Sequence, residues 1–561
     1  MTIKSIILLL FIGVVIMGCE KKISVIKDYA PIEHVRAQIE KLVPVEIGYD
    51  KNLLNPDEQQ ALYLLVKAAQ LMDSVFLQQV YSKNEMLLKD LKTGENSDYA
   101  VLLDYFMICF GPFDRLEQNR PFINLKEKKP AGANFYPPDM SKEEFQNWIK
   151  DHPEDEAALT SNFTLIRREN QKLVAVPYSQ AYLQKLQKAA DYLRQAAVLI
   201  ENPSLKKYLL SRAEAFLTND YFQSDMDWMD LTNHSIEVVI GPYEVYEDAL
   251  FNYKASFEAF ITLVDPSESS KLRVITRYLD RMERNLPIPA KYRNTRRGSH
   301  SPIVVVQEVF TAGDTKAGVQ TTAFNLPNDE RVREAKGSKK VMLKNVAQAK
   351  FEKCWLPIVY EVIAPEEWPF ITFDAYFNHV LMHEMSHGLG PGTIMKNGRE
   401  TTVNKELKET YSVIEEAKAD ILGVYNTEFL ININVLPDSL RWQTYSTFLG
   451  GIFRSIRFGI NSAHGGANAI SFNYIQQKGG FEYVKESGQF RVHREKIASA
   501  VRDLARELLI IQATGDYQAA VQFIETYRKL PLEVQNALKR LENVPVDIRP
   551  VFTIEAEIKQ R

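Results

Sequence analysis

The sequence predicts a mainly α-helical protein with a smaller mixed α/β part, arranged as two lobes separated by a cleft. Apolar residues recur at helical spacing over residues 53–81 and 179–217, and again over most of residues 347–541. Between these blocks, residues 274–322 contain several prolines and a strand-like run, Pro302–Val306. This change of pattern predicts a connection between two lobes.

The overall composition is that of an ordinary folded protein. The chain has 561 residues, of which 45% are hydrophobic and 25% charged, so it is long enough for more than one core. Its formal net charge is −4, and no block of lysine and arginine stands out. We therefore expect no nucleic-acid partner, and the oligomeric state stays open.

The first residues resemble a bacterial lipoprotein signal peptide. An apolar run over residues 6–17 is short for a membrane span, and it is followed by Gly18 and Cys19. Residues 1–18 are therefore expected to be removed, with Cys19 lipidated and residues 19–30 acting as a tether. The alternative is an uncleaved N-terminal anchor helix. Either way we expect a body tethered to the membrane of a bacterial cell envelope, facing the periplasm or on the outer membrane.

The remaining chain divides into three expected parts. Residues 31–265 are expected to form the mixed lobe, residues 266–346 the interlobe connection, and residues 347–561 the helical lobe. Cys109 and Cys354 lie in apolar surroundings, where a free cysteine behaves as a small buried hydrophobe. A single disulfide between them remains an alternative, but the chain is no disulfide scaffold.

The strongest chemical signal is the H-E-x-x-H pattern at residues 383–387. On a helix, His383 and His387 are four residues apart, so both imidazoles project from one face and can bind a single metal ion. Glu384 lies beside them, where it can take a proton from water. The pattern also occurs by chance in unrelated helices, but the flanking apolar stripe predicts a buried helix whose polar groups need partners.

A third ligand is available in Glu416, with Asp420 four residues later on the same helical face. Two imidazoles and one carboxylate leave the fourth position of tetrahedral zinc to water, which is typical of a catalytic site. Zinc lowers the pKa of such water from about 15.7 toward about 7. Asp420 suits the outer shell, where it would accept the N–H of a ligating histidine. His379 lies about 12 Å along the helix from His387, so we interpret it as an outer or packing residue.

With these motifs in place, the sequence resembles the dipeptidyl peptidase III family of zinc peptidases over roughly residues 236–509. Residues 240–248, followed by residues 257–260, are similar to the family's signature in the lobe opposite the zinc. The resemblance implies that Glu244 binds the free amino terminus of the substrate. It also implies that Tyr246 donates a hydrogen bond to the oxyanion.

Two further segments carry the resemblance. Asn325 and Asn328, followed by residues 337–346, resemble the loop in which two asparagines hold the substrate amine. His464 lies where the family places a histidine that stabilises the transition state. Without the resemblance, Tyr246 would be interpreted as a core tyrosine and His464 as a loop histidine.

The same matching makes Glu416 the zinc ligand and Glu415 a supporting carboxylate. In one respect the chain departs from the family, which carries H-E-x-x-G-H with one more residue between the histidines. Metal binding tolerates the shorter form because a spacing of four is regular on a helix. The placement of Glu384, and with it the choice of substrate, can differ.

The sequence therefore predicts a zinc metallopeptidase with one Zn²⁺ per chain and a zincin-like helical catalytic lobe. We expect it to release dipeptides from the amino terminus of short peptides by attack of a zinc-bound water that Glu384 activates. The mixed lobe and the connecting loop would contribute the substrate-binding residues. One alternative is a hydrolase of the same scaffold acting on another amide. Another is a non-catalytic, membrane-tethered oligopeptide-binding protein, against which the base Glu384 argues.

Overall fold

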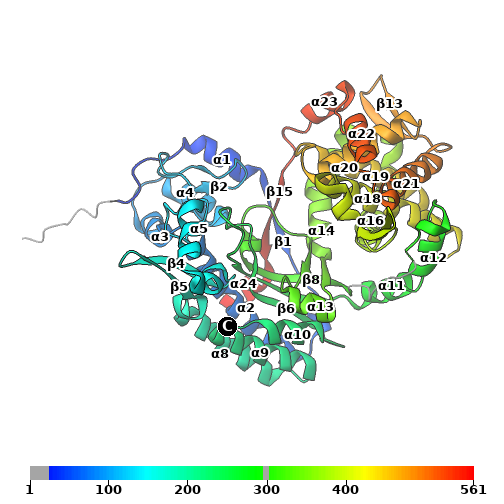
Figure 1. The fold of residues 1–561 in the computed structure, drawn as a ribbon. Coiled ribbons are helices and arrows are strands. Elements are labelled where there is room, and N and C mark those ends of the chain that lie inside the picture. The colour runs from blue at the N-terminus through cyan, green and yellow to red at the C-terminus, as the bar shows by residue number, and fades with distance from the viewer. Residues whose placement is uncertain (1–23, 295–301, 561) are drawn as a thin grey trace, which may run out of the picture.

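The computed structural model describes residues 24–294 and 302–560, which form two lobes (Figure 1). The lobe at the lower left, coloured blue to green, contains a five-stranded sheet and is called the sheet lobe here. The lobe at the upper right, coloured mainly yellow to orange, is built from helices and is called the helical lobe. The mainly helical, two-lobed fold predicted from the sequence is confirmed.

Helices surround the sheet of the sheet lobe, and α2 (Pro56–Val80) is the longest of them. It begins at a capping box formed by Asn55 and Glu58, with Pro56 in its first turn. Its buried face packs against two strands of the sheet. The other helices that precede the sheet in the chain are α1 (Ile32–Glu40), α3 (Asn84–Thr93), α4 (Tyr99–Cys109), α5 (Lys142–Asp151), α6 (Glu156–Thr160), α7 (Tyr178–Ala181), α8 (Leu183–Leu199), α9 (Pro203–Thr218) and α10 (Phe222–Met229).

The sheet has the strand order β6-β7-β8-β10-β9. Neighbouring strands are antiparallel except β8 and β10, which are parallel, with Val341 paired to Val304. β9 is an edge strand, so one side of its backbone has no strand partner within the sheet. The strands are β6 (Ile236–Glu244), β7 (Ser256–Val264), β8 (Ile303–Gly313), β9 (Ala323–Leu326) and β10 (Lys339–Leu343). Two short hairpins, β2 (Phe113–Asp114) with β3 (Arg120–Pro121) and β4 (Thr164–Glu169) with β5 (Lys172–Pro177), complete this lobe's antiparallel pairs.

The helical lobe is centred on α18 (Tyr411–Asn432), whose middle is buried on nearly every side. α18 packs against α16 (Phe373–Ser386), α20 (Ala463–Gln477) and α21 (Ile497–Thr514). The Thr372 hydroxyl caps the start of α16 by accepting from the Ala375 N–H. The lobe also contains α15 (Leu356–Val362), α17 (Val403–Leu407), α19 (Leu440–Ile456), α22 (Tyr517–Tyr527), α23 (Leu532–Lys539), and the hairpins β11 (Thr393–Lys396) with β12 (Arg399–Thr402) and β13 (Phe481–Val484) with β14 (Gln489–Val492). α14 (Lys344–Lys350) lies between the lobes and contributes buried residues to both cores.

The lobe boundaries differ from those expected from the sequence in two places. Three strands of the sheet, β8 to β10, fall in the segment expected to be a connection. They join the sheet because the backbone N–H and C=O groups of a buried strand need partners on a neighbouring strand. The C-terminal β15 (Asp547–Phe552) leaves the helical lobe and pairs in parallel with β1 (Leu42–Ile47), and α24 (Thr553–Lys559) follows it. The same expected segment also contains α11 (Pro266–Thr276) and α12 (Leu279–Asn285), whose buried apolar residues belong to the core of the helical lobe.

Three further expectations concern the termini and the thiols. Cys109 and Cys354 are both buried and free, so no disulfide joins them. The apolar run over residues 6–17 and Cys19 lie outside the described residues. Within the described part of the chain, no helix is long and apolar enough to cross a membrane.

Candidate active site

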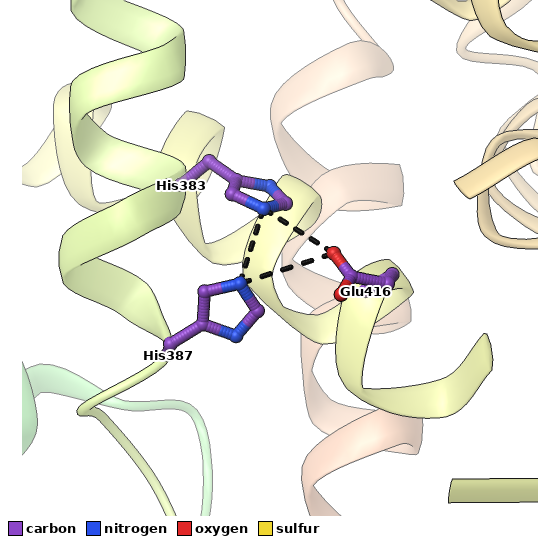
Figure 2. Close-up of side chains that lie close together, drawn as sticks. All are labelled: His383, His387 and Glu416. Carbon is purple, nitrogen blue, oxygen red and sulfur yellow. Dashed lines mark hydrogen bonds and ion pairs between the residues drawn. The ribbon is translucent and has the colours of Figure 1, made fainter. Parts of the chain in front are cut away.

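Two helices of the helical lobe bring the metal-binding candidates together. α16 carries His383 and ends next to His387, and α18 carries Glu416. The two Nε2 atoms lie 3.2 Å apart, and Glu416 Oε2 lies 3.3 Å from Nε2 of His383 and 3.8 Å from Nε2 of His387. Figure 2 shows the two rings one turn apart on their helix, with the carboxylate facing both. The three side chains thus converge on one point.

The far side of each imidazole is held by a carboxylate. His383 Nδ1 lies 2.7 Å from Asp420 Oδ1, and His387 Nδ1 lies 2.8 Å from Glu415 Oε1. Because a carboxylate accepts hydrogen bonds, these contacts place the ring protons on the Nδ1 atoms and leave the Nε2 lone pairs free. Both histidines are therefore oriented as metal ligands with their Nε2 atoms.

Further side chains hold the two outer carboxylates. Lys418 Nζ lies 2.9 Å from Glu415 Oε1, and Gln512 donates to the other oxygen of Glu415 at 2.8 Å. Asn468 donates to Asp420 Oδ2 at 3.0 Å. Burial alone would raise the pKa of the Glu415 carboxyl, but Lys418 and a neighbouring histidine outweigh it and lower this pKa to about 2.

The pKa values of His383 and Asp420 are also set by the charge that each side chain faces. Burial would lower the pKa of His383, but Asp420 above all raises it to about 10. Burial would likewise raise the pKa of Asp420, and the facing histidines lower it instead. A more basic imidazole is a stronger metal ligand, so the outer carboxylate strengthens the site.

The donor set fits a divalent cation such as zinc. Glu416 Oε2 is buried and accepts no hydrogen bond, although Nε2 of His383, Nε2 of His387 and Nδ1 of His464 lie 3.3, 3.8 and 3.3 Å from it. A buried carboxylate oxygen without a hydrogen bond is costly, and a cation held by this oxygen and the lone pairs of the facing nitrogens would satisfy it. A second group of possible ligands, His34, Asp114 and Glu117, does not fit. The oxygens of Asp114 already accept from Tyr105, Gln38 and backbone N–H groups.

Glu384 follows His383 on α16, and its carboxylate meets a lysine from the sheet lobe. Lys340 Nζ lies 2.5 Å from Glu384 Oε2 and 3.3 Å from its backbone oxygen. Burial would raise the pKa of Glu384, but the charge of Lys340 and the nearby histidines lower it. Glu384 is therefore ionised at neutral pH, as a base must be.

His464 and His379 flank the metal-binding cluster. His464 Nδ1 lies 3.3 Å from Glu416 Oε2, and its side chain is 66% exposed, so the ring is open to a substrate. His379 Nε2 lies 3.7 Å from Asp420 Oδ1, and its ring packs on Phe448 at 5.2 Å between centroids. His379 is thus a neighbour of the outer carboxylate and contributes no ligand to the cluster.

The sheet lobe groups Glu244 with Asn328. Glu244 ends β6, and the amide nitrogen of Asn328 donates to the Tyr243 carbonyl at 3.1 Å. The Asn328 amide oxygen already accepts from Arg333 at 2.9 Å. Asn325 is exposed on the edge strand β9. The amide N–H of Asn328 also interacts with the Glu244 carboxylate. This geometry differs from that of an amide oxygen that is free to accept a hydrogen bond from an ammonium.

Tyr246 projects into solvent from the same region. Its side chain is 80% exposed, and the charge of Glu244 is the main reason that its pKa is raised. Within residues 24–294 and 302–560, no hydrogen bond or ion pair connects Tyr246 or Glu244 to the metal-binding cluster. The structure therefore brings the helical-lobe residues into contact with one another but leaves these two in the other lobe.

Buried acids surround Glu244. Burial, together with the charges of Asp314 and Glu244, raises the pKa of Glu258 well above its ordinary range. Burial and the neighbouring acids likewise raise the pKa of Asp314. Glu247 differs, because Arg115 and Lys129 pair with its carboxylate at 3.0 and 2.6 Å. Glu258 and Asp314 therefore keep their protons to a higher pH than free carboxyl groups do.

Comparison with known proteins identifies the family. The model of peptidase family M49 matches residues 140–429, which is more than half of the chain. The chain belongs to peptidase family M49. The structure of DPP III from Caldithrix abyssi is 59% identical, with a TM-score of 0.91, over 93% of this chain and 100% of that one. The structure of dipeptidyl-peptidase III from Corallococcus sp. strain EGB is 40% identical, with a TM-score of 0.78, over 95% and 99%.

A curated relative carries a different name. "Nudix hydrolase 3" of Arabidopsis thaliana is 39% identical over 93% of this chain and 74% of its own length. The family match confirms the resemblance seen in the sequence. This M49 protein is accordingly a metallopeptidase of the dipeptidyl-peptidase type.

Sequence reasoning missed several residues of this M49 peptidase. Lys340 and Gln512 lie far from the H-E-x-x-H motif in the sequence. Lys418 lies between Glu416 and Asp420, but no local pattern predicts its contact with Glu415. Glu258 had a usable signal, because a glutamate inside the apolar strand β7 is buried on any pairing. That Glu258 lies close to Asp314 could be seen only in the tertiary structure.

Proposed function

We propose that the chain is a zinc-dependent exopeptidase that releases dipeptides from the amino terminus of short peptides. One observation carries this proposal above the others. The two imidazoles, each fixed through Nδ1 by a carboxylate, face the unpartnered oxygen of Glu416, and the ionised Glu384 is the residue next to His383. A binding protein that used zinc only for structure would need no such base.

In this proposal His383, His387 and Glu416 hold a single zinc ion. Bound zinc would polarise the scissile carbonyl and make water a nucleophile at neutral pH. Glu384 takes a proton from the attacking water and later donates it to the leaving amine. Asp420 and Glu415 keep the two rings in place during this exchange.

Two residues are proposed to stabilise the oxyanion. His464 lies beside Glu416 with an exposed ring, so it can donate to an oxygen that develops negative charge near the metal. Tyr246 is exposed on the opposite lobe and would donate from there. Removing one such donor typically costs about 2.7 to 4 kcal/mol of transition-state stabilisation.

The acids of the sheet lobe support recognition of a free amino terminus. Glu244, Glu258 and Asp314 repel one another in a partly buried region, and a cation bound there would relieve this repulsion. A substrate ammonium is such a cation, and Glu244, with Asn325 and Asn328 nearby, would receive it. The free edge of β9 can pair with an extended peptide through backbone hydrogen bonds.

The five-residue motif favours a second candidate, a hydrolase of the same scaffold that acts on another amide. A chromogenic dipeptidyl amide with a free amino group, assayed beside its N-acetylated analogue, separates the two. We expect turnover of the free amine, little of the acetylated compound, and loss of activity on chelation that zinc restores. Equal turnover of both compounds would favour the second candidate, and binding without turnover would favour an oligopeptide receptor.

We also propose that the protein is anchored to a bacterial envelope membrane through a lipid on Cys19. The apolar run at residues 6–17, directly before Gly18 and Cys19, supports this location. Metabolic labelling with a fatty acid should mark the wild-type chain and not Cys19→Ser. A labelled Cys19→Ser chain would contradict the anchor.

A further inference from the structure

Lys340 reaches Glu384 from the opposite lobe. Side chains alternate along β10, so Lys340 shares a face with Met342, which belongs to the core of the helical lobe. Val341 and Leu343 point the other way, into the core of the sheet lobe. The alternation of side chains along β10 therefore directs Lys340 toward the helical lobe, where it contacts the carboxylate of Glu384.

The contact is largely enclosed. The side chains of Lys340 and Glu384 are 18% and 22% exposed. They line a cavity of about 380 Å³ whose apolar walls include Leu272, Ile303 and Met385. An ion pair in such surroundings is screened less than one on the surface. The lysine therefore constrains the carboxylate more strongly than a surface partner would.

The two oxygens of Glu384 are used differently. Oε2 and the backbone oxygen of Glu384 both lie within reach of Lys340 Nζ. Among residues 24–294 and 302–560, no hydrogen bond reaches Oε1 of Glu384, and Lys340 Nζ has no acceptor outside Glu384. Lys340 thus holds Oε2 of Glu384, and Oε1 remains available to accept a proton.

We propose that Lys340 is a positioning residue for the catalytic base. By holding Oε2, it presents Oε1 of Glu384 to water, in the way that a base is commonly oriented by a third group. This inference rests on the proposed function, since it deepens the role given there to Glu384. Because Lys340 stands on β10 and Glu384 on α16, the orientation of the base depends on how the two lobes meet.

The test compares Lys340→Met with Lys340→Arg in the zinc-loaded full chain, using the free-amine dipeptidyl amide. A misplaced catalytic group costs up to about 100-fold in rate. We expect Lys340→Met to lower kcat by about 10- to 100-fold and to leave KM within about twofold. Lys340→Arg keeps the cation and should restore kcat to within about threefold.

Lys396→Met is a matched control. Lys396 Nζ lies 2.8 Å from Glu406 Oε2 and 2.6 Å from the Gly515 carbonyl, so it also pairs with a carboxylate and a backbone oxygen. Its side chain is 33% exposed, and neither of its partners contacts Glu384. We expect kcat within about twofold of the wild type, because only a general ion pair is lost.

A second readout does not depend on turnover. In a Glu384→Gln background, calorimetry with a short peptide should give a Kd that Lys340→Met changes by less than about twofold, with bound zinc unchanged. An unaltered kcat in Lys340→Met overturns the inference, and so does a raised KM with kcat intact, which would make Lys340 a substrate-binding residue. A wild-type chain without turnover overturns the proposed function itself, so the two failures are distinguishable.

Discussion

The carboxylates of the helical lobe and those of the sheet lobe differ in what neutralises them. In the helical lobe, Asp420 and Glu415 face histidines and a lysine, and their pKa values are lowered despite burial. In the sheet lobe, burial first and then neighbouring acids raise the pKa values of Glu258 and Asp314, and Arg115 and Lys129 offset only part of this effect at Asp314. One cluster is held in place by its own partners and is suited to a permanent metal, whereas the other is suited to a cation that comes and goes with the substrate.

The largest expected effect comes from breaking the helical-lobe cluster. His387→Ala removes one of the three proposed ligands and leaves Glu416 without one of its three facing ring nitrogens. We expect loss of bound zinc and a fall in kcat/KM of at least about 1,000-fold, because metal and base act together. Metal analysis of the purified protein together with the dipeptidyl amide assay measures both. His152→Ala, a histidine that stacks on Trp148 in the sheet lobe, is the control. Zinc retained by His387→Ala would contradict the ligand set.

The next effect concerns the substrate side. Glu244→Gln removes a charge but keeps a similar shape, and a hydrogen bond to a charged group contributes about 1.5–3 kcal/mol. We therefore expect kcat/KM for the free-amine substrate to fall by about 10- to 100-fold, with bound zinc unchanged. Activity on the N-acetylated analogue should change little. If both substrates lose activity equally, the sheet lobe does not select the amine.

Asp420→Asn tests how far the helical-lobe cluster depends on its outer shell. The amide still reaches His383 Nδ1 but carries no charge, so the imidazole becomes a weaker ligand. We expect about 10- to 100-fold weaker zinc binding in a competition with a chelating dye. Activity at saturating zinc should change less than the affinity does. Unchanged zinc affinity would show that Asp420 has no such role.

The smallest expected effect is on stability, and it tests whether Asp314 in the sheet lobe is held without a neutralising partner. The pKa of Asp314 is raised on folding from an ordinary value near 3.8 to about 7, so the folded chain binds this proton more tightly than the unfolded one. The contribution of Asp314 to stability is therefore full below about pH 4 and is lost as the pH rises to about 7.

Asparagine cannot ionise, so Asp314→Asn should raise the free energy of unfolding by about 1 to 3 kcal/mol at pH 8 and by much less at pH 4.5. Urea unfolding of the full chain at the two pH values measures the difference. The exposed Asp151→Asn is the matched control and should show no such pH dependence. Equal changes at both pH values would argue that Asp314 is already paired in the folded state.

The sequence by itself determined the parts of this protein that depend on local spacing. A spacing of four positions from His383 to His387 places both rings on one face of α16 whatever surrounds it. The same rule puts Glu416 and Asp420 on one face of α18. Helical periodicity located α2 and most of the helical lobe, because each helix satisfies its own backbone hydrogen bonds.

Only the tertiary structure decided what depends on pairing between distant segments. The sequence of a strand does not specify which other strand it pairs with. The sequence therefore could not assign β8 to β10 to the sheet lobe, or predict that β15 pairs with β1. The packing of α16 on α18 decided that Asp420 meets His383 while Glu415 meets His387. The register of β10 decided that Lys340 reaches Glu384. A shift of one residue would have turned Lys340 away from the helical lobe and into the core of the sheet lobe.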